Sequence, residues 1–403
     1  NTFCPEKKGS VISKKARGSE YAIRGISSID SIALLRVQGG GMVGIAGISK
    51  RLFTALAKKE INIILITQAS SEHSICIAVD PLEAQNAKNE IEEEFSLEIY
   101  AHQIEPVVIE EDLAIVAIVG ENMRLAAGVA GRLFSAIGKN GINLSAIAQG
   151  SSELNISCVI HKADVNKALN VIHDEFFHVG VKPLHVFIVG TGLIGSHLLE
   201  QIEQQKDFLE NEHRIELRVS GLANSRKMTF NEEGIYLPNW KEKIEKSTFP
   251  MDIDAFIKRI KEMNLRNTVF VDCTASDEMP LSYEELLRAR ISIVTPNKAA
   301  NTACYEEYRR LKNLSKRWGG KFFYETNVGA GLPVIGTLND LIASGDRVHK
   351  IEAVVSGTLS FICNGLKEGK KFSQLVQEAK DKGYTEPDPR GDLEGMDVKR
   401  KIL

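Results

Sequence analysis

The chain contains an internal repeat, and no other feature constrains its fold as strongly. Residues 47–79 (GISKRLFTALAKKEINIILITQASSEHSICIAV) align without a gap with residues 128–160 (GVAGRLFSAIGKNGINLSAIAQGSSELNISCVI). Gln68 and Gln149 occupy the same position in the two copies. Because self-similarity at a fixed spacing is typical of repeated structural units, we predict two copies of one small domain.

Each copy has the hydrophobic pattern of a strand, a helix, two strands and a second helix. Alternating or continuous apolar residues indicate the strands, and apolar residues three and four apart indicate the helices. In the first copy the five segments are residues 32–39, 48–60, 61–68, 73–79 and 81–95. This order makes up most of a βαββαβ unit, which is the ferredoxin-like arrangement.

The repeat resembles a pair of ACT regulatory domains, the amino-acid-sensing modules of biosynthetic enzymes. In each copy a glycine-bearing turn, QGGGMVG or VGENMRLAAG, leads into a helix start whose free N–H groups can hold a carboxylate. We expect ACT domains over residues 26–105 and 106–180. Gln68 and Gln149 are the expected effector-binding residues, because an amide can donate to a ligand oxygen and accept from its ammonium group. The alternative is a pair that only mediates assembly.

A dinucleotide-binding loop follows the repeat. The pattern Gly190-x-Gly192-x-x-Gly195 stands directly after the apolar strand 186–189 and before an amphipathic helix. Such glycines permit a tight turn and let a pyrophosphate approach the backbone amides at the helix start. The sequence therefore predicts a Rossmann domain over residues 183–310; a purely structural turn is the alternative. The expected cofactor contacts in this loop are Gly190, Gly192, Leu193, Ile194 and Gly195.

The loop after the next strand favours NADP(H) over NAD(H) as the cofactor. The strand RIELRVSGLA ends in residues 224–227 (NSRK), where an NAD-specific fold usually has an Asp or Glu. Arg226 and Lys227 can instead meet a 2′-phosphate. The alternative for this basic pair is a solvated turn.

Two further buried strands run into polar loops that contain Thr274 and Lys298. These strands lie in the segments TVFVDCTAS and ISIVTPNKAANT. Ligands bind where the carboxyl ends of parallel strands meet, so we expect Thr274 and Lys298 at the cofactor site. For Lys298 the alternative is an ordinary solvated lysine.

The segment FFYETNVGAGLP predicts a strand and a glycine-rich loop before another helix. The side chain of Glu325 and the backbone carbonyls of Val328, Ala330 and Leu332 can hold a monovalent cation such as Na⁺. The alternative is that the glycines only make a sharp turn. The segment IEAVVSGTLSFICNGL predicts a further strand and helix.

The most specific motif lies at the end of the sequence. Residues 379–401 follow the spacing A-x3-G-Y-T-x2-D-P-x2-D-L-x-G-x-D-x3-K, which resembles the homoserine dehydrogenase signature at every fixed position. Together with the ACT pair and the glycine loop, the whole chain resembles the bifunctional aspartokinase–homoserine dehydrogenase family. The resemblance implies that residues 1–25 are a linker from a missing kinase domain and that residues 311–403 begin an incomplete α/β substrate domain. We therefore expect the chain by itself to be inactive.

The resemblance implies a reaction, namely the reversible NADPH-dependent reduction of L-aspartate 4-semialdehyde to L-homoserine. Carboxylates would bind the α-ammonium group of the substrate through charge-assisted hydrogen bonds. Lys401 would handle the proton, with Lys298 near the nicotinamide. The residues implied to contact or orient the substrate are Gly383, Glu386, Asp392 and Asp397.

Composition alone favours a purely structural role for the charged residues of this segment. Asp397 and Lys401 are four residues apart, so they share one face of a helix and can form an exposed ion pair. Asp392 can be an ordinary helix N-cap. The match to the signature reverses this preference.

The charge balance gives no indication of a nucleic-acid or membrane partner. The chain has 50 basic and 53 acidic residues, a net charge of −3. No apolar run approaches the roughly 18 residues that a membrane-spanning helix needs. The six cysteines are scattered and form no CxxC pair, which is typical of a cytoplasmic protein.

The family also implies threonine as the effector and a homo-oligomer, a dimer or a tetramer. Two rival interpretations of the whole chain stay open. One is a non-catalytic amino-acid sensor in which the remainder is a docking element. The other is a different dinucleotide-dependent dehydrogenase that acts on an amino acid.

Overall fold

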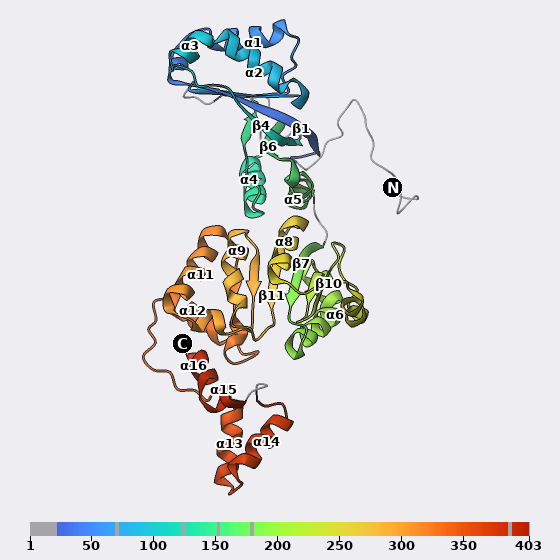
Figure 1. The fold of residues 1–403 in the computed structure, drawn as a ribbon, viewed down its shortest axis with the longest axis vertical. Coiled ribbons are helices and arrows are strands. Elements are labelled where there is room, and N and C mark those ends of the chain that lie inside the picture. The colour runs from blue at the N-terminus through green and yellow to red at the C-terminus, as the bar shows by residue number, and fades with distance from the viewer. Residues whose placement is uncertain are drawn as a thin grey trace. The chain divides into compact units, whose positions relative to one another are not determined.

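The computed structural model describes residues 22–68, 72–121, 123, 126–150, 154–177, 181–385 and 389–402. The chain divides into two compact units (Figure 1). The first unit runs to Phe177 except for the short segment Lys139–Gly141, and the second contains that segment and the chain from His178 onward.

The first unit contains the two copies of the repeat. Its strands are β1 (Gly25–Gln38), β2 (Leu65–Gln68), β3 (Ser74–Val79), β4 (Val108–Val119), β5 (Ala146–Gln149) and β6 (Asn155–His161). Its α-helices are α1 (Ile48–Lys58), α2 (Ala84–Glu94), α3 (Ser96–Tyr100), α4 (Val129–Lys139) and α5 (Val165–Phe177). The strands form one antiparallel sheet in the order β2-β3-β1-β4-β6-β5.

The long strands β1 and β4 belong to both copies. The second half of β1 pairs with β3 of its own copy and with the start of β4, residues 108–110. The first half of β1 pairs with residues 113–119 of β4, which in turn pair with β6. Register shifts after Ile29 and Ile32 mark the change between the halves. Each copy thus completes its sheet with a strand segment from the other, and the predicted ferredoxin-like fold is confirmed.

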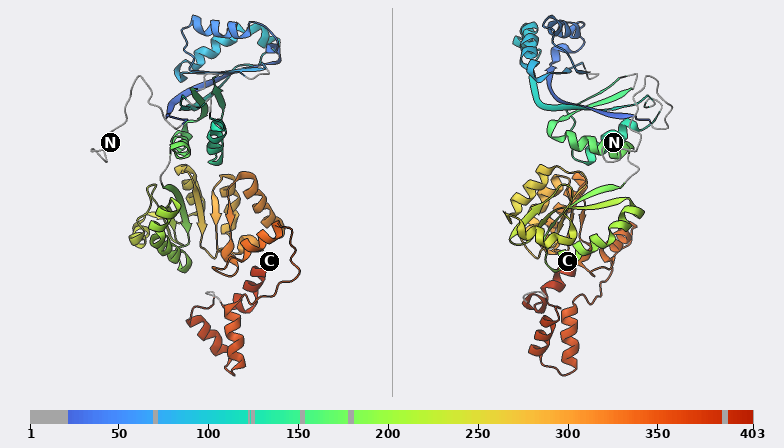
Figure 2. Two further views of the ribbon diagram at one scale, coloured as in Figure 1. Left: turned by 180° about the vertical axis from the view of Figure 1, so that it is seen from behind. Right: turned by 90° about the vertical axis from the view of Figure 1, so that its right-hand side faces the viewer.

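Helices cover the two halves of the sheet on their outer sides. In Figure 2 the pair α1–α2 and the pair α4–α5 lie on opposite sides of the strands. Alternate residues of β1 explain this arrangement, because side chains two apart in a strand share a face. Leu35 and Val37 pack against α1 and α2, whereas Ile32 and Leu34 join a separate core between the halves.

The repeat is visible in matching side-chain contacts. Arg51 of α1 forms an ion pair with Glu94 at 2.8 Å, and its guanidinium group lies 4.6 Å from the ring centre of Phe95. In the second copy Arg132 forms an ion pair with Glu175 at 2.8 Å and lies 4.7 Å from the ring of the phenylalanine that follows. In both copies this arginine links the first helix to the end of the second helix through an ion pair and a contact with an aromatic ring.

The second unit contains a seven-stranded sheet and its covering helices. Its strands are β7 (Lys182–Val189), β8 (Ile215–Ala223), β9 (Lys227–Phe230), β10 (Phe249–Pro250), β11 (Thr268–Asp272), β12 (Ser292–Val294) and β13 (Phe322–Phe323). Its first helices are α6 (Leu193–His213), α7 (Trp240–Lys246), α8 (Ile253–Met263), α9 (Tyr283–Arg288), α10 (Ala299–Thr302) and α11 (Tyr305–Trp318). Five further helices follow: α12 (Val334–Ala343), α13 (Gly357–Lys367), α14 (Phe372–Asp381), α15 (Pro389–Leu393) and α16 (Met396–Ile402).

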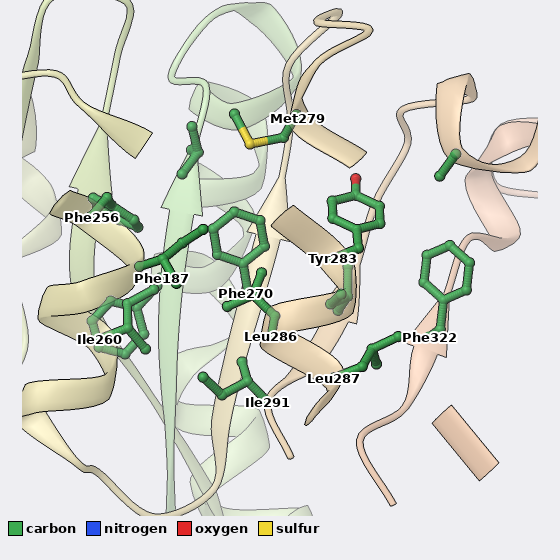
Figure 3. Close-up of a cluster of buried hydrophobic side chains, with 14 of the residues drawn as sticks. Phe187, Phe256, Ile260, Phe270, Met279, Tyr283, Leu286, Leu287, Ile291 and Phe322 are labelled. Atoms are coloured by element: carbon green, nitrogen blue, oxygen red, sulfur yellow. The ribbon is translucent and has the colours of Figure 1, made fainter. Parts of the chain in front are cut away.

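The strand order β10-β9-β8-β7-β11-β12-β13 is that of a Rossmann-type sheet with an antiparallel edge. Strands β8, β7, β11, β12 and β13 are parallel, and the order reverses at β7, between β8 and β11. One face packs on α6, and the other packs on α8, α9 and α11 through the apolar cluster in Figure 3. Because ligands bind at such a reversal, the carboxyl ends of β7 and β11 locate the site. The predicted Rossmann architecture is confirmed, and the sheet includes β13, beyond residue 310.

The predicted strand in IEAVVS is not formed. Residues 351–356 have no regular structure, and the side chains of Ile351 and Val354 are 60% and 86% exposed. A strand needs a neighbouring strand to pair with. In the described part of residues 333–402 all regular elements are helices, so no such neighbour is present there. Among the described helices, none combines the length and the apolar character needed to cross a membrane.

Candidate active site

The glycine loop has the geometry that its spacing predicts. Gly190 has φ = 94°, and a Cβ there would lie 2.8 Å from the carbonyl group of Cys273, so only glycine fits. A Cβ on Gly195 would lie 2.0 Å from the Gly190 oxygen. A Cβ on Gly192, at the N-cap of α6, would meet no protein atom within 4 Å. The loop therefore turns tightly and leaves space in front of the helix start.

A cavity of about 570 Å³ lies at this loop and has the position of a dinucleotide site. Its lining includes Gly190, Gly192, Arg226 and Thr274, and it is completed by Val189, Thr191, Asn224, Ser225, Met251, Ser276 and Met279. Leu193 and Ile194, the other predicted cofactor contacts, are 75% and 55% exposed at the start of α6. Backbone amides at a helix start favour an anion, so these residues fit a pyrophosphate.

The two basic residues after β8, Arg226 and Lys227, make different contacts. The Asn224 side chain accepts hydrogen bonds from the backbone N–H groups of Arg226 and Lys227, both at 2.8 Å, which shapes the turn. The ammonium group of Lys227 donates to the carbonyl of Glu245. Arg226 is exposed and lines the cavity. Of the two predicted 2′-phosphate ligands, the structure thus presents Arg226 to the cavity.

Three charged side chains lie close together in the second unit, those of Lys298, Asp397 and Lys401, although Lys298 stands about a hundred residues before the other two. Lys298 Nζ lies 3.3 Å from Asp397 Oδ1, and Lys401 Nζ lies 2.7 Å from Asp397 Oδ2. Lys401 also donates to the carbonyl of Val355 at 2.7 Å. The three charged side chains are between 16% and 22% exposed. The signature helix α16 therefore docks on the loop after β12.

The charges of this cluster hold Asp397 ionised. Burial by itself would raise the pKa of Asp397. The hydrogen bond from Lys401 and the positive charge of Lys298 outweigh that effect, so the pKa of Asp397 lies below its ordinary value. The carboxylate can therefore hold both ammonium groups in place at neutral pH.

A buried polar network that the sequence analysis missed lies behind this cluster. Asp272 is fully buried at the end of β11. Its carboxylate accepts from Thr274 N, the Tyr283 hydroxyl and the Asn297 amide. The only sequence signal was an aspartate that ends an apolar strand, which is also typical of an ordinary strand end.

The other predicted substrate residues are partly outside the described structure. Glu386 lies outside the described residues. Asp392 belongs to the short helix α15, and Gly383 follows α14 with φ = 69°, a backbone conformation that favours glycine. Their contacts with substrate stay predictions.

The predicted cation ligands do not form a free oxygen cage. Glu325 Oε1 accepts from Ile335 N and Oε2 from Gly336 N, each at 2.8 Å, so this carboxylate caps the start of α12. The carbonyl of Leu332 accepts from Val334 N at 2.9 Å. Val328 and Ala330 supply only backbone carbonyls from the same loop. Two of the four predicted ligands thus already accept backbone hydrogen bonds, and we assign Glu325 to capping.

In the first unit, Gln68 and Gln149 line the same cavity of about 740 Å³. The residues are at the ends of β2 and β5, and both are exposed. Ser27, Ser28, Thr67, Asn155 and Ser157 add polar groups, and Ile66, Ile115 and Ile147 are among its apolar residues. Such a mixture suits a small ligand with both polar and apolar parts.

Comparison with known proteins agrees with both units. The ACT domain model matches residues 35–95 and 116–176. The model described as the homoserine dehydrogenase NAD binding domain matches residues 190–325, and the homoserine dehydrogenase model matches residues 333–403.

Several named proteins are similar to the chain. A bifunctional aspartokinase/homoserine dehydrogenase of Haemophilus influenzae is 41% identical over 403 residues, which is 100% of this chain and 49% of that protein. A homoserine dehydrogenase of Schizosaccharomyces pombe is 39% identical over 226 residues, 54% of this chain and 60% of that protein. A solved structure of a hyperthermophilic archaeal homoserine dehydrogenase in complex with NADPH has 28% identity and a TM-score of 0.47, and covers 54% of this chain and 67% of that chain.

The family-model match over residues 190–325 agrees with the glycine loop and the parallel sheet in defining a Rossmann-type NAD-binding domain. More narrowly, the chain belongs to the homoserine dehydrogenase family, and a pair of ACT domains precedes its nucleotide-binding domain. The chain spans about half the length of the curated relatives it matches.

Proposed function

We propose that the protein catalyses the reversible, NADPH-dependent reduction of L-aspartate 4-semialdehyde to L-homoserine. The observation that carries the proposal is the carboxylate of Asp397 between the ammonium groups of Lys298 and Lys401, in the unit that carries the dinucleotide cavity. The nicotinamide, when bound, supplies the hydride. The residues of the chain supply alignment and the proton.

Lys401 is suited to donate that proton. An ammonium group has three N–H donors, and two of them face Asp397 and the carbonyl of Val355. The third is left for the aldehyde oxygen of the substrate. As hydride reaches the carbonyl carbon, negative charge grows on this oxygen, and Lys401 transfers a proton to form the alcohol. Lys401 then regains a proton from water, since its side chain is 19% exposed.

Lys298 and Asp397 support this step. The positive charge of Lys298 favours the ionised state of Asp397. Its ammonium group contacts Asp397 Oδ1, whereas Lys401 contacts the other oxygen. Asp397 in turn orients the ammonium group of Lys401. We propose that Gly383, Glu386 and Asp392 complete the substrate site and that the carboxylates bind the α-ammonium group.

Arg226 supports NADPH as the preferred cofactor. Its side chain is exposed at the cavity, next to the turn that follows β8. In a Rossmann fold this turn faces the adenosine ribose, and a guanidinium group there matches a 2′-phosphate.

The cavity at Gln68 and Gln149 supports threonine as an effector. Two amide side chains can recognise the carboxylate and ammonium groups of an amino acid, and the apolar floor suits a methyl group. We further propose that the protein assembles as a homo-oligomer, and that the complete gene also encodes an aspartokinase domain, as the names of its relatives suggest.

Turnover separates this proposal from a non-catalytic sensor. The protein, expressed with the full sequence of its gene, is mixed with NADPH and L-aspartate 4-semialdehyde, and absorbance at the nicotinamide band is followed. The proposal predicts consumption of NADPH that depends on semialdehyde. Threonine binding without any turnover would identify a sensor instead.

A further inference from the structure

Asp272 is the most deeply buried acidic side chain near the candidate site. One carboxylate oxygen accepts from Thr274 N at 2.7 Å. The other accepts from the Tyr283 hydroxyl at 2.6 Å and the Asn297 amide at 3.1 Å. Figure 3 shows that the Tyr283 hydroxyl lies at the edge of the apolar cluster. All of these partners are donors, which is the pattern of an ionised carboxylate.

The neighbours of Asp272 strengthen this arrangement. The Thr295 hydroxyl donates to the backbone carbonyl of Asp272 at 3.0 Å. Burial and the charge of Asp272 raise the pKa of Tyr283, so its hydroxyl stays a donor. Because a buried charge is costly without hydrogen-bond partners, the donors and the carboxylate fix one another.

The network connects the cofactor cavity with the lysine cluster. Thr274 and Ser276 line the cavity, and the Asn297 amide also donates to the carbonyl of Ser276 at 2.8 Å. Asn297 directly precedes Lys298, the residue that reaches Asp397. Asp272 therefore contacts both the loop of Thr274, which lines the cofactor cavity, and the loop that carries Asn297 and Lys298.

We propose that Asp272 is a positioning residue that holds the cofactor loop at Thr274 and the loop of Lys298 in one fixed arrangement. In Asp272→Asn one carboxylate oxygen becomes an NH₂ group, so either Thr274 N or the pair of donors from Tyr283 and Asn297 faces another donor, and the two loops are no longer held together. A displacement of about 1 Å at a catalytic group can lower a rate about 10²-fold. The turnover readout of this inference rests on the proposed reductase function, whereas cofactor affinity tests it separately.

The first test compares Asp272→Asn with Asp80→Asn. Asp80 is a matched control because its carboxylate also accepts a hydrogen bond from the backbone N–H of the second residue after it, Leu82, at 2.9 Å. Asp80 belongs to the first unit, whereas the cofactor cavity belongs to the second. We expect Asp272→Asn to weaken NADPH binding about 10-fold and to lower kcat about 10- to 100-fold. Asp80→Asn should leave both within about twofold.

The second test asks whether Asp272 acts through Lys298. In a Lys298→Ala background, with kcat measured at high enzyme concentration, Asp272→Asn should lower kcat by less than about threefold, because no ammonium is left to place. Equal losses with and without Lys298, together with unchanged NADPH affinity, would show that Asp272 is only structural.

If Asp272→Asn does not fold, Tyr283→Phe answers the same question. It removes one donor to Asp272 and keeps the ring in the apolar cluster. Tyr308→Phe is its control, since the Tyr308 hydroxyl contacts that of Tyr324 at 2.9 Å outside the network. We expect Tyr283→Phe, but not Tyr308→Phe, to lower kcat at least about threefold, and only when Lys298 is present. A wild type that leaves the semialdehyde unreduced would refute the proposed function instead, and NADPH affinity would then decide the inference.

Discussion

The carboxylate of Asp397 contacts two lysines through different oxygens. Lys298 Nζ lies 3.3 Å from Oδ1, and Lys401 Nζ lies 2.7 Å from Oδ2. The first lysine follows a strand of the Rossmann sheet and the second lies on the signature helix. The carboxylate thus joins the loop after β12 to the helix α16.

Two glycine substitutions should separate packing from cofactor binding. Gly195→Ala places a methyl group 2.0 Å from the Gly190 oxygen and should destabilise the protein by about 1–3 kcal/mol. Gly192→Ala meets no protein atom within 4 Å and should leave stability nearly unchanged while blocking NADPH. Thermal unfolding and fluorescence titration measure the two effects. Normal NADPH affinity in Gly192→Ala would mean that the cofactor does not approach this backbone.

Arg226→Ala should weaken NADPH much more than NADH. The loss of an ion pair with a 2′-phosphate costs about 1.5–3 kcal/mol, or about 10- to 150-fold in affinity. Lys227→Gln is the control, because the Lys227 ammonium group donates to the carbonyl of Glu245. Titration of each variant with both cofactors is the measurement. Equal losses for the two cofactors would show Arg226 to be only a surface residue.

Gln68→Ala and Gln149→Ala should each lower the affinity for threonine. The loss of a hydrogen bond to a charged ligand group costs about 1.5–3 kcal/mol. Gln85→Ala is the control, since Gln85 contacts Asn89 on the surface of α2. Calorimetry gives the affinities. Unchanged binding in both cavity variants would exclude this site, and tighter binding of lysine or methionine would redirect the effector assignment.

The docking of α16 should depend on pH. Because the folded pKa of Asp397 lies below its unfolded value, the stabilising contribution is present at neutral pH and is lost as pH falls below about 4, through the folded pKa. Asp397→Asn should therefore expose α16 to hydrogen exchange at pH 7, and the difference from wild type should shrink at pH 3. A constant difference at both pH values would rule out this charge as the cause.

Local patterns predicted the parts of the fold whose partners are close in sequence. The repeat predicted two ferredoxin-like units, and the glycine spacing predicted the turn before α6. The four-residue spacing of Asp397 and Lys401 placed both on one helix face, as the structure shows. The position of Lys298 followed from the rule that parallel strands end at one edge.

Other features depend on segments that are distant in sequence. The Asp272 network draws donors from two loops and from the start of α9, and an aspartate after an apolar run does not reveal them. The shared strands β1 and β4 depend on pairing between the copies. The segment 351–355 (IEAVV) resembles a strand locally but has no described neighbour with which to pair.

The proton donor can be tested by comparing Lys401→Ala with Lys399→Ala, an exposed lysine of the same helix, in the protein expressed with its full gene sequence. The substrate is L-aspartate 4-semialdehyde, and NADPH affinity is measured alongside kcat. We expect Lys401→Ala to lower kcat at least about 10²-fold with NADPH affinity nearly intact, and Lys399→Ala to have little effect. A Lys401→Ala enzyme with wild-type kcat, with activity abolished instead by Lys298→Ala, would contradict the assignment of Lys401 as the donor.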